Sequence, residues 1–252
     1  MSVRHSRTFR ATSRKPLPAL AIFGREPVPR RAKTRLIPLL GPRGSADFHA
    51  ALVSDALQKV NRLGARVAPY FFLAGGSYPV SSSLSEYKLV KQRGVDLGER
   101  LDRAFRLMLA RHPSALVIGT DSPLLPRRVL LQALGKLRTS DAALGPCPDG
   151  GFYVIGLRRI ESGLFNRIRW GSASAFEDVR GNLQARDFSC AILEKVDDVD
   201  RPEDVVRLAG ELAKSREARR IAPCAWGFLK DFLVLKAQRK TQRNAPAPPA
   251  AS

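Results

Sequence analysis

Two aspartates follow apolar runs of this sequence in a way that could place both at one edge of a sheet. Asp121 comes after the run 115–118, and Asp149 comes about one helix and one strand later. Four apolar residues without polar alternation are typical of a parallel strand that is buried on both faces. Open α/β sheets bind ligands at the carboxyl ends of such strands, and two carboxylates there could hold Mg²⁺ or Mn²⁺ against a diphosphate. The alternative is that Asp121 caps the next helix and that Asp149 makes a turn.

A basic loop with two prolines follows the first predicted strand, residues 17–23. The loop spans residues 24–36, and its prolines disfavour a helix. Because arginine forks onto phosphate oxygens and lysine acts as a point charge, the loop is a candidate phosphate clamp at the same sheet edge as Asp121. It lacks the glycines of a Walker loop, and a solvated basic loop is the alternative. Its cations are Arg25, Arg30, Arg31, Lys33 and Arg35.

The segment 91–101 combines a glycine-containing turn with the start of a predicted helix. Gly94 and Gly98 allow a ligand to approach the backbone, and free N–H groups at a helix N-terminus bind an anion or a base edge. Asp96 and Glu99 also complement the positive end of the helix dipole. The segment is therefore either part of a ligand site or a well-capped helix start.

These segments need a regular scaffold to bring them together. Strands and helices alternate along the chain, which predicts an α/β fold with a doubly wound, mostly parallel sheet. The acids of residues 200–203 read as a capping box with Pro202 in the first helical turn. Strands are predicted at 17–23, 67–74, 88–90, 115–118, 142–144, 151–157 and 189–193, and helices at 45–63, from within 91–101 to about 111, and at 127–137, 176–186 and 203–214.

Length, charge and cysteine usage bound the class of protein. The 252 residues suffice for one large α/β domain, and 44% hydrophobic residues are typical of a globular chain. The formal net charge of +20 suits nucleic acid, an anionic membrane or a phosphorylated ligand, but part of it lies near the ends. No apolar run is long enough for a transmembrane helix. Three separated cysteines without a CxxC pair fit a reducing compartment, so we expect a cytoplasmic protein.

The composition divides the chain into three parts. We predict a disordered basic tail at 1–16, for which a transit peptide is the alternative, a folded domain at 17–214, and a basic extension at 215–252 that ends in a disordered Ala/Pro tail. Within the extension, residues 225–243 place apolar side chains on a broad arc followed by basic residues. This segment predicts either a peripheral contact with an anionic membrane or a helix that docks on the domain.

Five motifs in this order resemble a known bacterial family, over residues 17–212. The family is a glycosyltransferase-like one associated with radical-SAM proteins and arsenosugar biosynthesis, and it is similar to the 2-phospho-lactate and molybdopterin guanylyltransferases. The motifs are Pro27-Val28-Pro29 with Lys33-Thr34-Arg35-Leu36, Gly94-Val95-Asp96-Leu97-Gly98-Glu99-Arg100-Leu101, Ile118-Gly119-Thr120-Asp121-Ser122-Pro123, Gly145-Pro146 with Asp149-Gly150-Gly151-Phe152-Tyr153, and Asp198-Val199-Asp200-Arg201-Pro202-Glu203-Asp204.

The resemblance implies the GT-A nucleotide-diphospho-sugar transferase fold and a nucleotide or nucleotide-sugar donor. It implies Mg²⁺ or Mn²⁺ at Asp121 and Asp149, with Asp149 and Lys33 in catalysis. Arg30 and Arg25 depart from the family pattern, which usually has Gly and Lys at these two positions. The nucleotide-binding residues that it implies are Phe23, Arg25, Lys33, Arg35, Gln92, Gly94 and Asp96.

Three functions are compatible with these residues. The first is a metal-dependent, glycosyltransferase-like enzyme that transfers from a nucleotide-sugar donor to a small-molecule acceptor. The second is a nucleotidyltransferase, guanylyltransferase-like, that acts on a phosphorylated small molecule, because the same residues serve both reactions. The third is a basic adaptor for RNA or membrane with a degenerate enzyme core. No specific nucleic acid is expected, because the sequence lacks an aromatic stacking platform with basic residues between.

Overall fold

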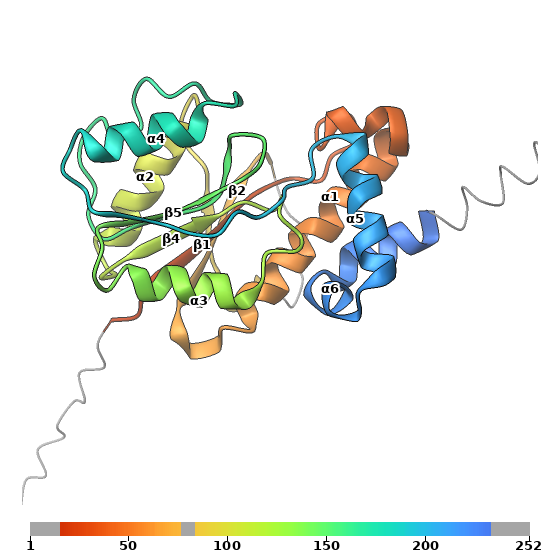
Figure 1. Ribbon diagram of the computed structural model, residues 1–252, viewed down its shortest axis with the longest axis horizontal. Helices are drawn as coiled ribbons and strands as arrows, with labels where there is room; N and C mark the ends of the chain where they lie inside the picture. The colour runs from red at the N-terminus through yellow and green to blue at the C-terminus, as the bar shows by residue number, and fades with distance from the viewer. Residues whose placement is uncertain (1–15, 77–83, 233–252) are drawn as a thin grey trace, which may run out of the picture.

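The computed structural model describes residues 16–76 and 84–232 and shows one twisted sheet with helices on both faces (Figure 1). The seven strands lie in the order β3-β2-β1-β4-β6-β5-β7. The predicted α/β class with a mostly parallel sheet is confirmed. The strands are β1 (Ala19–Arg25), β2 (Ala68–Ala74), β3 (Lys88–Lys91), β4 (Ala115–Ile118), β5 (Ala142–Pro146), β6 (Phe152–Leu157) and β7 (Cys190–Ile192).

One strand runs against the others for a simple reason. β1 is parallel to β2 and β4, and β5 is parallel to β7, whereas β6 is antiparallel to both β4 and β5. Residues 147–151 connect β5 to β6, and a connection this short cannot cross over the sheet as a parallel pair requires. The short connection therefore forms a hairpin, and its loop carries Asp149 to the same edge as the end of β4.

Helices cover the two faces with separate apolar clusters. On one face α1 packs on β1 and α3 packs on β5, through side chains such as Val53, Leu57 and Val129. On the other face α2 and α4 pack through side chains such as Phe105 and Val179. The helices are α1 (Ile37–Asn61), α2 (Leu97–Leu109), α3 (Arg127–Lys136), α4 (Ala175–Gln184), α5 (Pro202–Lys214) and α6 (Arg216–Ile221), with 3₁₀ turns at Thr34–Leu36 and Gly64–Arg66.

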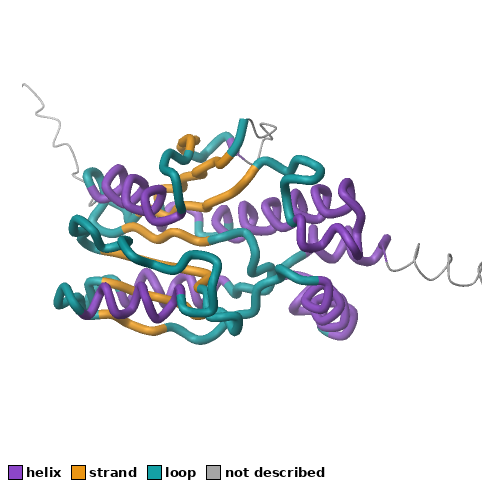
Figure 2. Tube along the Cα trace, turned by 90° about the horizontal axis from the view of Figure 1, so that it is seen from above, coloured by secondary structure: helices purple, strands orange, loops and turns teal. Residues whose placement is uncertain are grey.

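A third apolar cluster lies beyond the sheet, where α5 and α6 meet α1 (Figures 1 and 2). Residues 223–232 are helical, and Ala225 and Leu229 are fully buried in this cluster. The ring of Phe228 lies 5.3 Å from that of Phe48 on α1. For residues up to 232, the structure thus favours the docked helix over the membrane contact, and residues 233–243 lie outside the described part. Within the described residues, no helix has the length and hydrophobicity to span a bilayer.

Three helices begin at other residues than predicted, and for α4 the difference is a single residue, Ala175 instead of residue 176. α1 starts at Ile37 instead of residue 45, with a break at Gly41, which has φ +73°, followed by Pro42. α5 starts at Pro202 after the N-cap Arg201. The predicted capping box is shifted by one residue, because the carboxylate of Asp204 accepts from the N–H groups of Asp200 (3.1 Å) and Arg201 (2.9 Å).

A segment without regular structure, residues 193–200, joins β7 to α5 across the edge of the sheet (Figure 1). We call it the crossing segment. It is held by backbone hydrogen bonds from Leu193 to Leu144 (2.9 Å), from Val196 to Pro146 (3.2 Å) and from Val199 to the carbonyl of Asp121 (2.9 Å). These bonds fix the crossing segment above the ends of the strands, where its side chains meet the loops of residues 119–123 and 147–151.

Candidate active site

Two adjoining pockets of different charge lie at the carboxyl ends of β1 and β4. The basic pocket has a volume of about 620 Å³ and the acidic pocket about 200 Å³. Arg35, Asp121 and Asp200 line both, so the pockets meet at these residues. The charged side chains of the basic pocket include Arg25, Arg31, Lys33, Arg35 and Arg100, and those of the acidic pocket include Asp121, Asp149, Asp198 and Asp200.

Lys33 lies at the junction, and its ammonium group is bound by the protein. Nζ lies 2.8 Å from Oδ1 of Asp121 and 2.7 Å from Oδ1 of Asp200, and it donates to the carbonyl oxygen of Val199 at 2.6 Å. The side chain is only 6% exposed. Burial opposes its charge, but the two carboxylates outweigh burial and raise the pKa of Lys33. The ammonium that was predicted to hold a phosphate is thus committed to three acceptors within the protein.

Asp121 does not cap the following helix, so the capping alternative is wrong. α3 begins after Pro126, whereas the carboxylate of Asp121 pairs with Lys33 and its carbonyl receives the N–H of Val199. The carboxylate is 46% exposed. Although the loss of surrounding solvent opposes its charge, Lys33 holds the pKa of Asp121 below its usual range. Asp121 therefore presents a charged carboxylate at the junction.

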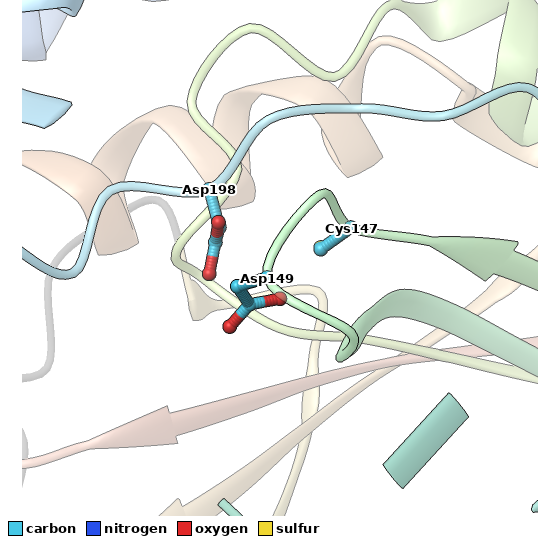
Figure 3. A group of neighbouring side chains, drawn as sticks. All are labelled: Cys147, Asp149 and Asp198. Carbon is cyan, nitrogen blue, oxygen red and sulfur yellow. The ribbon is translucent and has the colours of Figure 1, made fainter. Parts of the chain in front are cut away.

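Three side chains that could bind a metal converge in the acidic pocket (Figure 3). Sγ of Cys147 and carboxylate oxygens of Asp149 and Asp198 all lie within 4.8 Å of one another. Figure 3 shows Asp198 reaching from the crossing segment toward Asp149. Burial, together with the nearby charges of Asp149 and Asp200, raises the pKa of Asp198 to about 6. The carboxylates of this cluster therefore repel one another, and a bound cation would relieve the repulsion.

The donor set fits a hard divalent cation. Carboxylate oxygens are the ligands that Mg²⁺ and Mn²⁺ prefer. Burial and the neighbouring aspartates raise the pKa of the Cys147 thiol above its usual range, so the thiol stays protonated and is a weak ligand. Asp149 and Asp198 would hold such an ion, and Cys147 would line its surroundings.

The loop that carries Asp149 is fixed by a glycine. Gly150 has φ +87°, and a Cβ there would lie 2.0 Å from the carbonyl oxygen of Ala173. The carbonyl of Gly150 accepts from the N–H of Phe176 near the start of α4 (2.9 Å). Oδ1 of Asp149 accepts from the N–H of Gly151 (2.8 Å). Asp149 thus makes the turn that the alternative predicted, and its side chain also lines the acidic pocket.

Five of the seven predicted nucleotide-binding residues line the basic pocket. Two of them also brace it, because the amide nitrogen of Gln92 donates to the carbonyls of Gly24 (3.1 Å) and Phe72 (2.8 Å), and the ring of Phe23 lies 5.2 Å from that of Phe72. The guanidinium of Arg25 donates to the carbonyl of Arg31 (3.3 Å). The five residues are Phe23, Arg25, Lys33, Arg35 and Gln92.

The other two predicted residues, Gly94 and Asp96, do not line either pocket. Gly94 has φ +146°, and a Cβ there would lie 2.7 Å from Cβ of Glu99, so this position serves the tight turn before α2. Oδ1 of Asp96 accepts from the N–H of Glu99 (2.8 Å) and caps α2. For Asp96 the structure shows the helix-start alternative, and its side chain faces a separate groove beside α2.

His49 is a packed side chain that borders the basic pocket. It is 5% exposed, and Nε2 lies 3.1 Å from the carbonyl oxygen of Arg25. Nδ1 is buried without a hydrogen-bond partner among the described residues. Burial lowers the pKa of His49, so a neutral imidazole braces the end of β1.

Sequence reasoning missed three charged residues of the site. Arg100 lies one helical turn into α2, and its Nε donates to the carbonyl of Gly94 (3.1 Å) at the wall of the basic pocket. Asp200 was assigned to helix capping, which Asp204 performs instead, and Asp198 was given no role of its own. A usable signal was present, because residues i and i+2 of an extended segment point to the same side.

Comparisons with known proteins support the fold. The family described as "Uncharacterized protein conserved in bacteria (DUF2064)" matches residues 65–172. No curated protein matches the chain by sequence. A solved structure from Desulfovibrio desulfuricans G20, provisionally assigned as a nucleotide-diphospho-sugar transferase, is 27% identical with a TM-score of 0.78, and the match covers 88% of this chain and 97% of that one.

More distant structures share the fold alone. CMP:2-keto-3-deoxy-manno-octonic acid synthetase, solved with CTP, is 10% identical with a TM-score of 0.51 and matches 79% of this chain and 99% of its own. A 4-diphosphocytidyl-2C-methyl-D-erythritol synthase from Anaerococcus prevotii DSM 20548 is 9% identical with a TM-score of 0.53 and matches 78% and 96%. The chain thus has the fold of nucleotide-diphospho-sugar transferases and nucleotidyltransferases, and its structural neighbours are transferases.

Proposed function

We propose that this protein is a metal-dependent transferase that takes a nucleotide-diphospho-sugar donor. The observation that carries the proposal is the division of charge at the end of the sheet, where a basic pocket meets an acidic pocket at Arg35, Asp121 and Asp200. A nucleotide sugar is complementary to this arrangement. Its anionic diphosphate suits the basic pocket, and the hydroxyl groups of its neutral sugar can donate hydrogen bonds to the carboxylates of the acidic pocket. The similarity to the Desulfovibrio protein supports this donor class.

The basic pocket would bind the nucleotide. Arg25, Arg35 and Arg100 bring fixed positive charge to the place where a diphosphate would lie. Phe23 and Gln92 form part of the wall against which the nucleoside would rest. Charge that develops on a leaving nucleoside diphosphate is stabilised by groups that are already in position.

The acidic pocket would bind the sugar and the acceptor hydroxyl. Asp149 and Asp198 would hold Mg²⁺ or Mn²⁺, which acts as a Lewis acid on phosphate oxygens when bound. The carboxylates accept hydrogen bonds from hydroxyl groups, and the neighbouring side chains of Phe152 and Trp170 offer apolar surface to the sugar ring. The sugar and the acceptor remain proposals, including the arsenosugar-associated role that the resemblance implies.

Nucleotidyl transfer is the second candidate, because the fold is shared with cytidylyltransferases such as the synthetase solved with CTP. In that reaction a phosphorylated acceptor attacks the α-phosphate of a nucleoside triphosphate and pyrophosphate leaves. The lining of the acidic pocket favours it less, since among the described lining residues Arg35 is the single cation, and the nearby ammonium of Lys33 is committed to Asp121 and Asp200. Product analysis separates the two reactions, because glycosyl transfer frees a nucleoside diphosphate and nucleotidyl transfer frees pyrophosphate.

The binding of the donor is tested by a thermal-shift screen with nucleoside di- and triphosphates and nucleotide sugars, with and without Mn²⁺. A ligand at 100 times its Kd stabilises the native state by about 2.7 kcal/mol. We expect one nucleotide class to raise the Tm of the wild type, a loss of that shift in Arg100→Ala, and no loss in Arg138→Ala, which changes an exposed arginine near the end of α3.

The same screen tests the metal. The part of the shift that depends on Mn²⁺ should disappear in Asp198→Asn. A nucleic acid that binds wild type and Arg100→Ala equally, together with no response to any nucleotide, would support the basic adaptor instead.

A further inference from the structure

The ammonium group of Lys33 has no donor left for a ligand. An ammonium carries three N–H donors. In Lys33 they face three acceptors at 2.6, 2.7 and 2.8 Å, one carbonyl and two carboxylates. The side chain is 6% exposed, so a phosphate in the basic pocket could reach Nζ only if one of these partners were released.

The two carboxylates are held around this ammonium by the backbone. The N–H of Val199 donates to the carbonyl of Asp121, which ties the crossing segment to the end of β4. Val199 also gives its own carbonyl to Lys33. Asp121 and Asp200 therefore lie on either side of one cation, at distances that an oxygen–ammonium pair prefers.

The second pair of acids in the site differs in this respect. Asp149 and Asp198 lie within 4.8 Å of each other and of Cys147, and no ion pair to either of them occurs within the described residues, 16–76 and 84–232. Lys33 thus supplies a positive charge to the pair Asp121 and Asp200. Among the described residues, no side chain supplies one to the pair Asp149 and Asp198.

We propose that Lys33 is a built-in cation. Its ammonium fills the position between Asp121 and Asp200, keeps a divalent ion out of that position, and so directs the ion to Asp149 and Asp198. Lys33 is then a positioning residue rather than a ligand of the nucleotide. The second half of this inference rests on the proposed function, since it takes the metal site of the acidic pocket as given.

The inference is tested by counting bound Mn²⁺ ions by electron paramagnetic resonance, without any substrate. We expect one ion per chain in the wild type and two in Lys33→Met, because the uncharged side chain leaves Asp121 and Asp200 to a second ion. The double variant Lys33→Met with Asp200→Asn should return to one. Lys136→Met, which removes an exposed lysine on α3, is the matched control and should bind as the wild type does.

A second set of variants keeps Lys33 in place, in case Lys33→Met does not fold. Asp200→Asn should retain its single Mn²⁺ with a Kd within about threefold of the wild type, whereas Asp198→Asn should weaken binding roughly 100-fold or more, because a carboxylate ligand is lost. The opposite pattern, with the ion lost in Asp200→Asn and kept in Asp198→Asn, would overturn the inference.

The outcomes also separate this inference from the proposed function. One ion in both wild type and Lys33→Met overturns the role of Lys33 and leaves the metal site standing. No ion in the wild type but one in Lys33→Met supports the role of Lys33 and refutes the metal site at Asp149 and Asp198.

Discussion

Two buried lysines of this protein have opposite protonation behaviour. Lys33 sits at the pocket junction and donates to the carbonyl of Val199, and Lys59 lies under the loop after β4 and donates to the carbonyl of Pro123. Burial works against the charge of both. Two carboxylates in contact raise the pKa of Lys33, whereas burial, with a contribution from Arg62, lowers the pKa of Lys59 to about 8.

The two lysines differ in pKa because the acid nearest to Lys59, Asp55, uses its carboxylate oxygens for other hydrogen bonds. Asp55, one helical turn before Lys59, gives its carboxylate to the N–H groups of Cys224 (2.8 Å) and Ala225 (2.9 Å) at the start of the helix 223–232. Its attraction to Lys59 remains, but it does not outweigh burial. A buried lysine thus stays protonated when a carboxylate contacts its ammonium directly. A nearby acid whose oxygens bind other groups does not offset the cost of burial.

The largest loss of stability is expected when Asp55, the acid near Lys59, is replaced. The variant Asp55→Ala leaves two N–H groups without their acceptor beneath a docked helix, and each such group costs about 1–3 kcal/mol. We expect the free energy of unfolding to fall by about 3 kcal/mol in urea titrations. Asp47→Ala, on the exposed side of the same helix α1, is the control and should change little. Equal midpoints for the two variants would show that the docked helix does not depend on Asp55.

A smaller effect is expected when the two lysines are replaced in turn by methionine. Lys33→Met should lower the free energy of unfolding by about 2 kcal/mol at pH 7, because it leaves two partly exposed carboxylates facing each other. Lys59→Met should cost less than about 1 kcal/mol, since it removes a charge whose burial is unfavourable. A cost for Lys59→Met as large as that for Lys33→Met would contradict the comparison.

The pH dependence of the two lysine variants sharpens the same test. The native pKa of Lys59, about 8, lies below the ordinary value of 10.5, so the cost of its charge is full below pH 8 and is relieved as the pH rises toward 10.5. Wild type should gain stability over that range relative to Lys59→Met. Lys33 has the opposite sign, because its raised pKa makes its contribution present below pH 10.5 and lost above.

The smallest effect concerns the acid pair that has no cation. The pKa of Asp198 is raised from 3.8 to about 6, so the native state holds a proton that the unfolded state has released, and stability falls as the pH rises through this interval. Asp198→Asn should therefore be more stable than the wild type by about 1 kcal/mol at pH 7 in metal-free buffer, after allowance for partial exposure. Melting curves at pH 4.5 and pH 7 measure this, and a stability difference that does not change with pH would count against it.

The scaffold was predictable from the sequence because its signals are local. Unbroken apolar runs marked the buried strands, and the alternation with helical spacing gave the parallel sheet. Asp121 and Asp149 were correctly placed at one edge, since each directly follows a strand that ends there. The basic loop after β1 reaches the same edge for the same reason.

The partners of the site were not predictable, because they are set by contacts between distant segments. The crossing segment has no helical or alternating pattern, and nothing near Lys33 indicates that its acceptors are Val199 and Asp200. Asp200 was interpreted as a capping residue and Asp198 was given no role, although their spacing by two in an extended segment was a signal for a shared face. Local sequence patterns predicted where Asp121 and Asp149 lie in the fold. Long-range packing determines which of the acids are paired with a cation.

The crossing segment also has a consequence for how the protein is made. Lys33 is separated from two of its partners, Val199 and Asp200, by 166 and 167 residues along the chain. A polypeptide emerging from the ribosome exposes Lys33 long before Val199 exists, and pairing across so long a separation is slow and costly in loop entropy. Strands β1, β2 and β4 can align during synthesis, whereas the junction of the two pockets waits for the last third of the chain. Emergence of residues 199 and 200, rather than alignment of β1, β2 and β4, therefore sets the earliest moment at which this junction can form.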